Sequence, residues 1–134
     1  MDDKDTISFT ITRIVKAPLE EVFSALANEE QLSEYLGECT LEPQKGGKVS
    51  LFDGWVKGKV LEFMFLETLS YTWKPAEWDE KTPYSVVKYV FKDLENYTEI
   101  ILTHSNFISK KEAESHKKGW EEFVFAPLEV YLGL

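Results

Sequence analysis

The sequence predicts an α+β protein in which a curved antiparallel sheet, of about six or seven strands, packs around a long C-terminal helix. Two observations indicate this architecture. Residues 38–106 are mostly strand-like runs separated by short turns, and a helical spacing of apolar residues extends from Ser109 to the C-terminus. Strands joined by short turns pair most simply as an antiparallel meander. The 134 residues fit one domain spanning residues 1–134.

The first strand is expected at residues 7–15, ISFTITRIV, where apolar and polar residues alternate as in a strand with one buried face. Two short helices should follow. In APLEEVFSAL, Pro18 suits a first helical position, and the apolar residues recur at helical spacing. In NEEQLSEYL, Asn28 and Gln31 have the spacing of a capping box, which predicts the start of the second helix.

The remaining strands are predicted from alternating or apolar runs bounded by turn residues. Asp53 and Gly54 form a tight hairpin signal, and Gly58 lies inside a strand, where it permits a bulge or a sharp coil. A strongly curved sheet would need such a feature. The expected strands are KVSLF, WVKGKVLEF, TLSYTW, YSVVKYVFKD and YTEIILTHS.

The C-terminal helix is expected to begin with a capping box formed by Ser109 and Glu112. Gly119 and Pro127 are both unfavourable inside a helix, and Pro127 should kink it because proline removes one backbone hydrogen bond. A continuous helix would place one stripe of residues against the sheet, namely His116, Trp120, Phe123, Pro127 and Tyr131.

The ordered set of these elements resembles a known family. It carries APLEEVF after the first strand, then GGKVSLFDGWVKGKVLE, LSYTW, TEIILTHSNF and HKKGWEEF. This order resembles the helix-grip fold of the START-like superfamily and, within it, the activator of heat-shock protein 90 ATPase homologue family. The resemblance spans essentially the whole chain.

The resemblance implies a cavity between the sheet and the long helix. Members of the wider superfamily bind lipids, sterols or polyketide-like molecules there, and a few are cyclases or hydrolases. The namesake activators stimulate the chaperone's ATPase with a similar domain and an additional N-terminal domain. Because this chain begins directly at the first strand, we expect it to lack that additional domain.

We therefore expect a non-enzymatic protein that binds a small apolar or amphipathic ligand. The alternatives are an interaction module for a heat-shock protein 90 chaperone and a cyclase- or hydrolase-like enzyme. Aromatic residues that completely fill the core would leave no cavity. Trp78 either flanks the mouth of the cavity or pins its loop. The expected ligand-binding residues are Tyr71, Trp73, Tyr89, Phe91, Leu102, His104, His116, Trp120 and Phe123.

No catalytic constellation is evident in the sequence. His104 is a candidate general acid or base, or else a hydrogen-bonded histidine near the cavity. With two histidines and the single cysteine Cys39, the sequence predicts no metal site, no disulfide and no cofactor.

The net charge of −9 disfavours nucleic acid as a partner. No apolar run is long enough for a membrane span, and MDDKD does not resemble a secretory signal, so we expect a cytoplasmic protein. It should be a monomer or a homodimer. A second apolar stripe on the C-terminal helix either packs on the two short helices or forms a partner-binding patch, and it comprises Phe125, Leu128 and Leu132.

Overall fold

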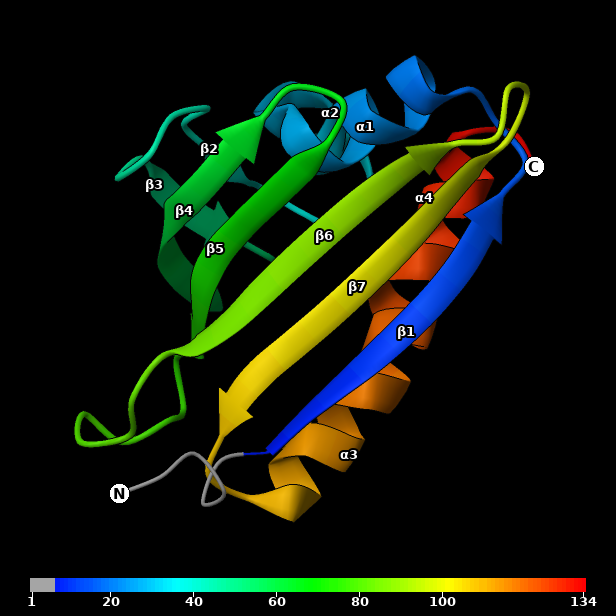
Figure 1. The fold of residues 1–134 in the computed structure, drawn as a ribbon. Coiled ribbons are helices and arrows are strands. Elements are labelled where there is room, and N and C mark those ends of the chain that lie inside the picture. The colour runs from blue at the N-terminus through cyan, green and yellow to red at the C-terminus, as the bar shows by residue number, and fades with distance from the viewer. Residues whose placement is uncertain (1–6) are drawn as a thin grey trace.

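Seven antiparallel strands form one sheet in the computed structural model, which describes residues 7–134 (Figure 1). The MDDKD stretch lies outside the described residues. The strand order β1-β7-β6-β5-β4-β3-β2 confirms a meander from β2 to β7, and β1 extends it at one edge by pairing with β7. The strands are β1 Ile7–Val15, β2 Thr40–Leu41, β3 Lys48–Leu51, β4 Val56–Met64, β5 Thr68–Pro75, β6 Ser85–Asp93 and β7 Thr98–Phe107.

Two short helices follow β1, as predicted, and lie at one end of the sheet (Figure 1). Helix α1 spans Leu19–Ala27 and begins one residue later than expected, with Pro18 as its N-cap. Helix α2 spans Glu29–Tyr35, and the Asn28 side chain accepts a hydrogen bond from the Gln31 backbone N–H at 3.0 Å. The predicted cap is therefore confirmed.

The C-terminal helix has three consecutive parts and runs behind the sheet along β1 and β7 (Figure 1). These are α3 Lys110–Gly119, a π-helical segment Trp120–Phe125 and α4 Ala126–Tyr131. Ser109 caps α3 as predicted, by accepting from the Glu112 N–H at 3.2 Å. The irregularity expected at Pro127 lies just before it, since the Ala126 N–H bonds to the Glu121 carbonyl five residues back.

The π-helical segment changes which residues face the sheet. A π turn takes more residues than an α turn, so Val124 and Phe125 share the buried side with Trp120. The expectation that Phe123 lies on that side is wrong, because Phe123 is 57% exposed. It assumed a regular α-helical period through the whole segment.

An arginine on β1 holds this part of the helix. Arg13 forms ion pairs with Glu121, inside the π segment, and with Glu129 on α4, where its Nη2 lies 2.8 Å from Oε1. The Arg13 guanidinium also lies over the Phe125 ring, 5.5 Å from its centroid. One side chain thus links the edge strand to the π segment and to α4.

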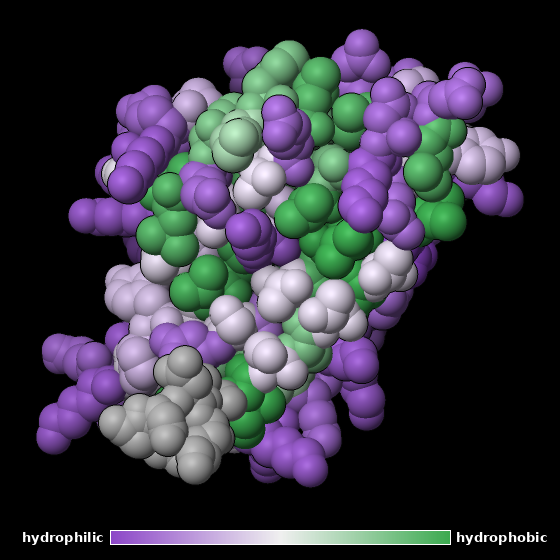
Figure 2. Space-filling model, viewed as in Figure 1, coloured by the Kyte–Doolittle hydropathy of each residue, from purple (hydrophilic) through white to green (hydrophobic). Residues whose placement is uncertain are grey.

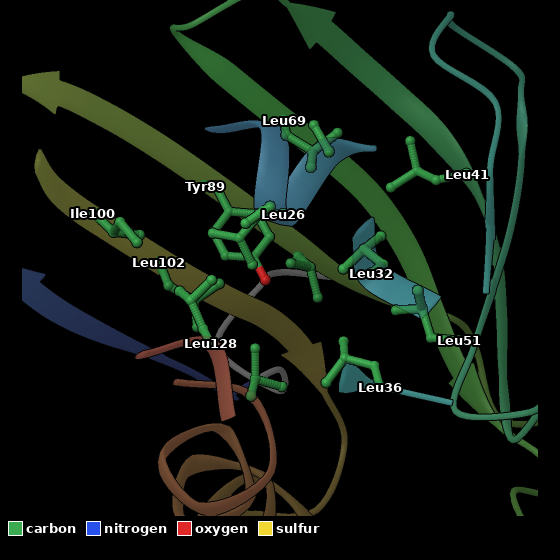
Figure 3. Packing of buried hydrophobic residues seen from close by; sticks show 14 of the residues in the cluster. Leu26, Leu32, Leu36, Leu41, Leu51, Leu69, Tyr89, Ile100, Leu102 and Leu128 are labelled. Carbon is green, nitrogen blue, oxygen red and sulfur yellow. The ribbon is translucent and has the colours of Figure 1, made fainter. Parts of the chain in front are cut away.

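The core lies between the inner face of the sheet and the helices. Figure 3 shows Leu26 of α1, Leu32 of α2 and Leu128 of α4 in one buried cluster with Tyr89 and Leu102 of the sheet. All five side chains are at most 3% exposed. On the outer face of the sheet, hydrophilic side chains separate the hydrophobic ones (Figure 2).

Gly58 is required where β4 and β5 approach each other. A Cβ atom on Gly58 would lie 1.8 Å from the Thr72 carbonyl oxygen. The neighbouring Lys59 N–H bonds to the Thr72 side-chain hydroxyl at 2.9 Å, in place of a backbone carbonyl. The expected irregularity is present, but the shift in pairing register occurs between Val60 and Glu62 rather than at Gly58.

Candidate functional site

Two histidines, His104 buried and His116 partly buried, connect the sheet to the C-terminal helix. His104 of β7 is completely buried, and its Nδ1 accepts a hydrogen bond from Trp120 Nε1 at 3.0 Å. Its Nε2 lies 2.8 Å from the Ser85 hydroxyl, which itself donates to the Trp73 carbonyl. This network assigns the proton to Nε2, so His104 is neutral with both nitrogens engaged.

Burial also lowers the pKa of His104 well below its ordinary value, and His116 lowers it further. A general acid or base needs contact with the group it protonates or deprotonates. His104 has no exposed surface and no free ring nitrogen, so it serves as a hydrogen-bonded link between strand and helix.

His116 of α3 lies beside His104, with ring centroids 5.4 Å apart. Its Nε2 accepts from Trp73 Nε1 at 3.1 Å, so its Nδ1 carries the proton and donates to the Glu112 carbonyl at 3.0 Å. Burial lowers the pKa of His116, although Glu112 and Glu77 oppose the shift. His116 is therefore a neutral aromatic surface at pH 7.

A cleft opens beside His116, between α3, the β3–β4 turn and the loop after β5, and its volume is about 180 Å³. Trp55 lies nearly parallel to His116, with an interplanar angle of 14°, and Trp73 packs 5.1 Å from Trp120. The aromatic residues that line the cleft are Phe52, Trp55, Trp73, His116, Trp120 and Phe123.

Two carboxylates border the same cleft, and an indole N–H fixes each of them. Trp55 Nε1 donates to Glu77 at 2.6 Å, and Trp78 Nε1 donates to Glu112 at 3.1 Å. Trp78 also packs against His116, with centroids 5.8 Å apart. Trp78 thus fixes its loop to α3 through Glu112, which lines the cleft.

The predicted ligand-binding residues divide into two groups. Trp73, His116, Trp120 and Phe123 line the cleft, where Phe123 forms part of the exposed rim. The other five lie in the packed interior and do not line it, and these are Tyr71, Tyr89, Phe91, Leu102 and His104.

The second apolar stripe of the helix packs inward. Phe125 and Leu128 have no exposed surface, and Leu132 is partly buried against the core. Tyr35 of α2 stacks on Tyr131 of α4 with centroids 5.0 Å apart. The stripe is therefore buried on the side of the short helices, which was one of the two alternatives. The other, a partner-binding patch, is wrong.

Four cleft residues were not predicted from the sequence, namely Phe52, Trp55, Glu77 and Glu112. Phe52 and Trp55 flank the predicted turn at Asp53 and Gly54, so the turn itself brings their rings within 5.9 Å. Glu112 was identified only as a helix cap. No local signal relates Glu77 to the helix, because the contact depends on how distant segments meet.

In the described residues 7–134, no group of acidic, histidine and cysteine side chains is arranged to hold a metal ion. The same residues include no helix that is long and apolar enough to cross a membrane.

Comparison with known proteins gives a family and a fold. Residues 16–133 match the family model of the Activator of Hsp90 ATPase homolog 1-like protein. The chain is 25% identical over 130 residues to mouse (Mus musculus) Activator of 90 kDa heat shock protein ATPase homolog 2, covering 96% of this chain and 39% of that protein. The chain thus spans about two fifths of the length of the curated relatives it matches.

Solved structures agree with the helix-grip architecture. An HSP90 activator from Plasmodium falciparum has a TM-score of 0.85 and 30% identity, covering 95% of this chain and 96% of that one. Ara h 8.0201 has a TM-score of 0.76 at 14% identity, covering 94% of this chain and 96% of that one, which shows the fold alone.

Proposed function

This chain belongs to the Activator of Hsp90 ATPase homolog 1-like family, and on that premise we propose that it binds an Hsp90-type chaperone and raises its rate of ATP hydrolysis. The observation that carries the proposal is the similarity to the Plasmodium falciparum HSP90 activator, which extends over nearly the full length of both chains. The region of similarity is the whole helix-grip domain rather than one motif.

The filled interior supports a role at the surface. Tyr71 and Tyr89, which would have bordered a central cavity, are at most 3% exposed and lie with ring centroids 6.4 Å apart. His104 and Trp120 close the space between them and the helix through their hydrogen bond. An interaction module needs no internal cavity, so this packing fits the proposed function.

A basic groove on the outer face of the sheet is our candidate for the chaperone contact. Lys48 lies directly opposite Lys59 in the β3–β4 pairing, and Lys57 lies opposite Lys74 in the β4–β5 pairing. Like charges at directly opposed positions destabilise a sheet. Exposed Leu61 and Tyr84 line the groove together with three of these lysines, Lys48, Lys57 and Lys59.

The groove fits an acidic segment of a chaperone. Within residues 7–134, no ion pair neutralises Lys48, Lys57 or Lys59, although the protein as a whole has a net charge of −9. Acidic groups of a partner would relieve the repulsion between the lysines, and apolar contact with Leu61 would add to the affinity.

The test uses the full chain and an Hsp90 from the same source, with steady-state ATP hydrolysis and calorimetric binding as readouts. We expect binding and a faster ATPase, both reduced in Lys57→Glu/Lys59→Glu. The matched control, Lys110→Glu/Lys111→Glu, changes the same charge at the exposed start of α3. Absence of binding at about 100 μM, with an unchanged ATPase, would refute the proposed function.

The cleft supports a second function, the binding of a small molecule. Its volume of about 180 Å³ is below the ~300 Å³ at which typical sites for drug-sized ligands begin. A ligand of sterol size would therefore place only one end in it. Native mass spectrometry of the purified protein should detect a retained ligand of low mass, and loss of its retention in Trp55→Leu would assign it to the cleft.

A further inference from the structure

The chemistry of the cleft indicates which class of small molecule it accepts. The faces of aromatic rings carry partial negative charge and attract cations, most strongly those of tryptophan. Trp55, Trp73 and Trp120 come from three separate segments and meet at this one place. Trp55 is 39% exposed although its ring packs against Phe52 and His116, so part of a tryptophan face is open to an incoming group.

The charged side chains that line the cleft also favour a cation. Glu77 and Glu112 line the cleft, and each accepts an indole N–H that holds its carboxylate in place. No lysine or arginine is among the described residues that line the cleft. His116 does not supply a positive charge either, because Trp73 donates to its Nε2. The cleft therefore presents two negative groups and no positive one.

Size and ligand type narrow the class of cation. Magnesium and calcium prefer sets of oxygen ligands, whereas most of this lining is aromatic carbon. A quaternary ammonium group has no strong hydrogen-bond donor and presents methyl groups to the surrounding rings, as aromatic cages require. A cleft of about 180 Å³ has room for one such head group but not for a long chain attached to it.

We propose that this cleft is a binding site for the trimethylammonium group of a small organic cation. The inference rests on the second proposed function, since it names the ligand class of the same cleft. A free choline-like compound and a choline lipid head group share this chemistry, and the ligands tested separate them.

Indole ¹H–¹⁵N resonances provide a local readout, because the chain has four tryptophans and three of them line the cleft. The ligands to titrate are choline, its neutral isostere 3,3-dimethylbutan-1-ol, and dihexanoylphosphatidylcholine below its micellar concentration. We expect choline to shift the Trp55 resonance saturably, with an affinity at least about tenfold above that of the isostere. If dihexanoylphosphatidylcholine binds more tightly than choline, the natural ligand is a lipid head group. If the two affinities are equal, the natural ligand is the free cation.

Charge-removing variants test the role of the carboxylates. Glu77→Gln and Glu112→Gln keep an oxygen that accepts the indole hydrogen bond, and each should weaken the affinity for choline about twofold to fivefold. The matched control is Glu114→Gln, an exposed residue of α3 outside the cleft, which should leave the affinity unchanged.

Two outcomes would overturn the inference and leave the second function standing: equal affinities for choline and the neutral isostere, or equal weakening by all three glutamine variants. Absence of any shift with all three ligands would also overturn the inference, whereas the second function is tested by the ligand retained in native mass spectrometry. The chaperone assays are independent of all these results, because they measure a different surface.

Discussion

Replacing Gly119 with alanine should stabilise the protein and narrow the cleft at the same time. Gly119 has regular helical angles, φ −62° and ψ −37°, so a side chain causes no backbone strain. The nearest atom to an added Cβ is Phe123 Cδ2 at 3.8 Å, an ordinary van der Waals contact. Glycine costs a helix about 1 kcal/mol relative to alanine, so the free energy of unfolding should rise by about 0.5–1 kcal/mol.

Urea denaturation followed by far-ultraviolet circular dichroism measures this change without relying on the tryptophans near the site. Gly58→Ala is the matched comparison. Its Cβ would lie 1.8 Å from a backbone oxygen, so the free energy of unfolding should fall by about 1–3 kcal/mol or more. Because Gly119 lines the cleft, Gly119→Ala should also weaken ligand binding. A Gly119→Ala protein less stable than the parent would refute the reasoning.

Three further predictions concern stability measured by urea titration. The pKa of His104 in the folded protein lies below its ordinary 6.5, so the contribution of His104 to the free energy of unfolding is complete above about pH 6.5 and is lost as the pH falls. A urea midpoint that is unchanged between about pH 7.5 and pH 5 would contradict this. Asn28→Ala should cost about 1 kcal/mol and Asn28→Asp much less, since aspartate keeps the cap; equal losses would argue against capping. Phe125→Ala should lower the free energy of unfolding by about 3–5 kcal/mol, whereas Phe123→Ala, at an exposed position, should change it by no more than about 0.5 kcal/mol. The reverse order would contradict the π-helical segment, which buries Phe125 and exposes Phe123.

Local chemistry predicted most of the fold. Capping pairs such as Asn28 with Gln31, and Ser109 with Glu112, act within four residues, so the sequence alone located these helix starts. Turn residues and alternation likewise located six of the strands, but not the two-residue β2, Thr40–Leu41. The pairing of β1 with β7 joins residues such as Phe9 and His104 that are far apart in the chain, and no local pattern specifies it.

The site was harder to predict because it depends on one irregular helical segment and on contacts between loops. A standard α-helical period placed Phe123 toward the sheet and Phe125 on the opposite side of the helix, whereas the structure buries Phe125 and exposes Phe123. The aromatic residues of the sheet were identified as inward facing, but alternation cannot distinguish a packed core from a lined cavity. The pairing of Trp55 with Glu77 links a turn to a loop and becomes visible only once both are folded.

The π-helical segment accommodates one residue more between Trp120 and Leu128 than a regular α-helix would. In a regular α-helix, eight residues turn the chain about 80° beyond two full turns, which would separate the directions of these two side chains. The wider turn brings both to the buried side. Deleting one residue from Trp120–Phe125 would let a regular α-helix span the same interval, because seven residues turn the chain only about 20° short of two full turns and so keep Leu128 on the buried side. The extra residue therefore determines which side chains of the segment face inward rather than where α4 packs, and a relative with a one-residue gap there would keep the same C-terminal packing on a regular helix.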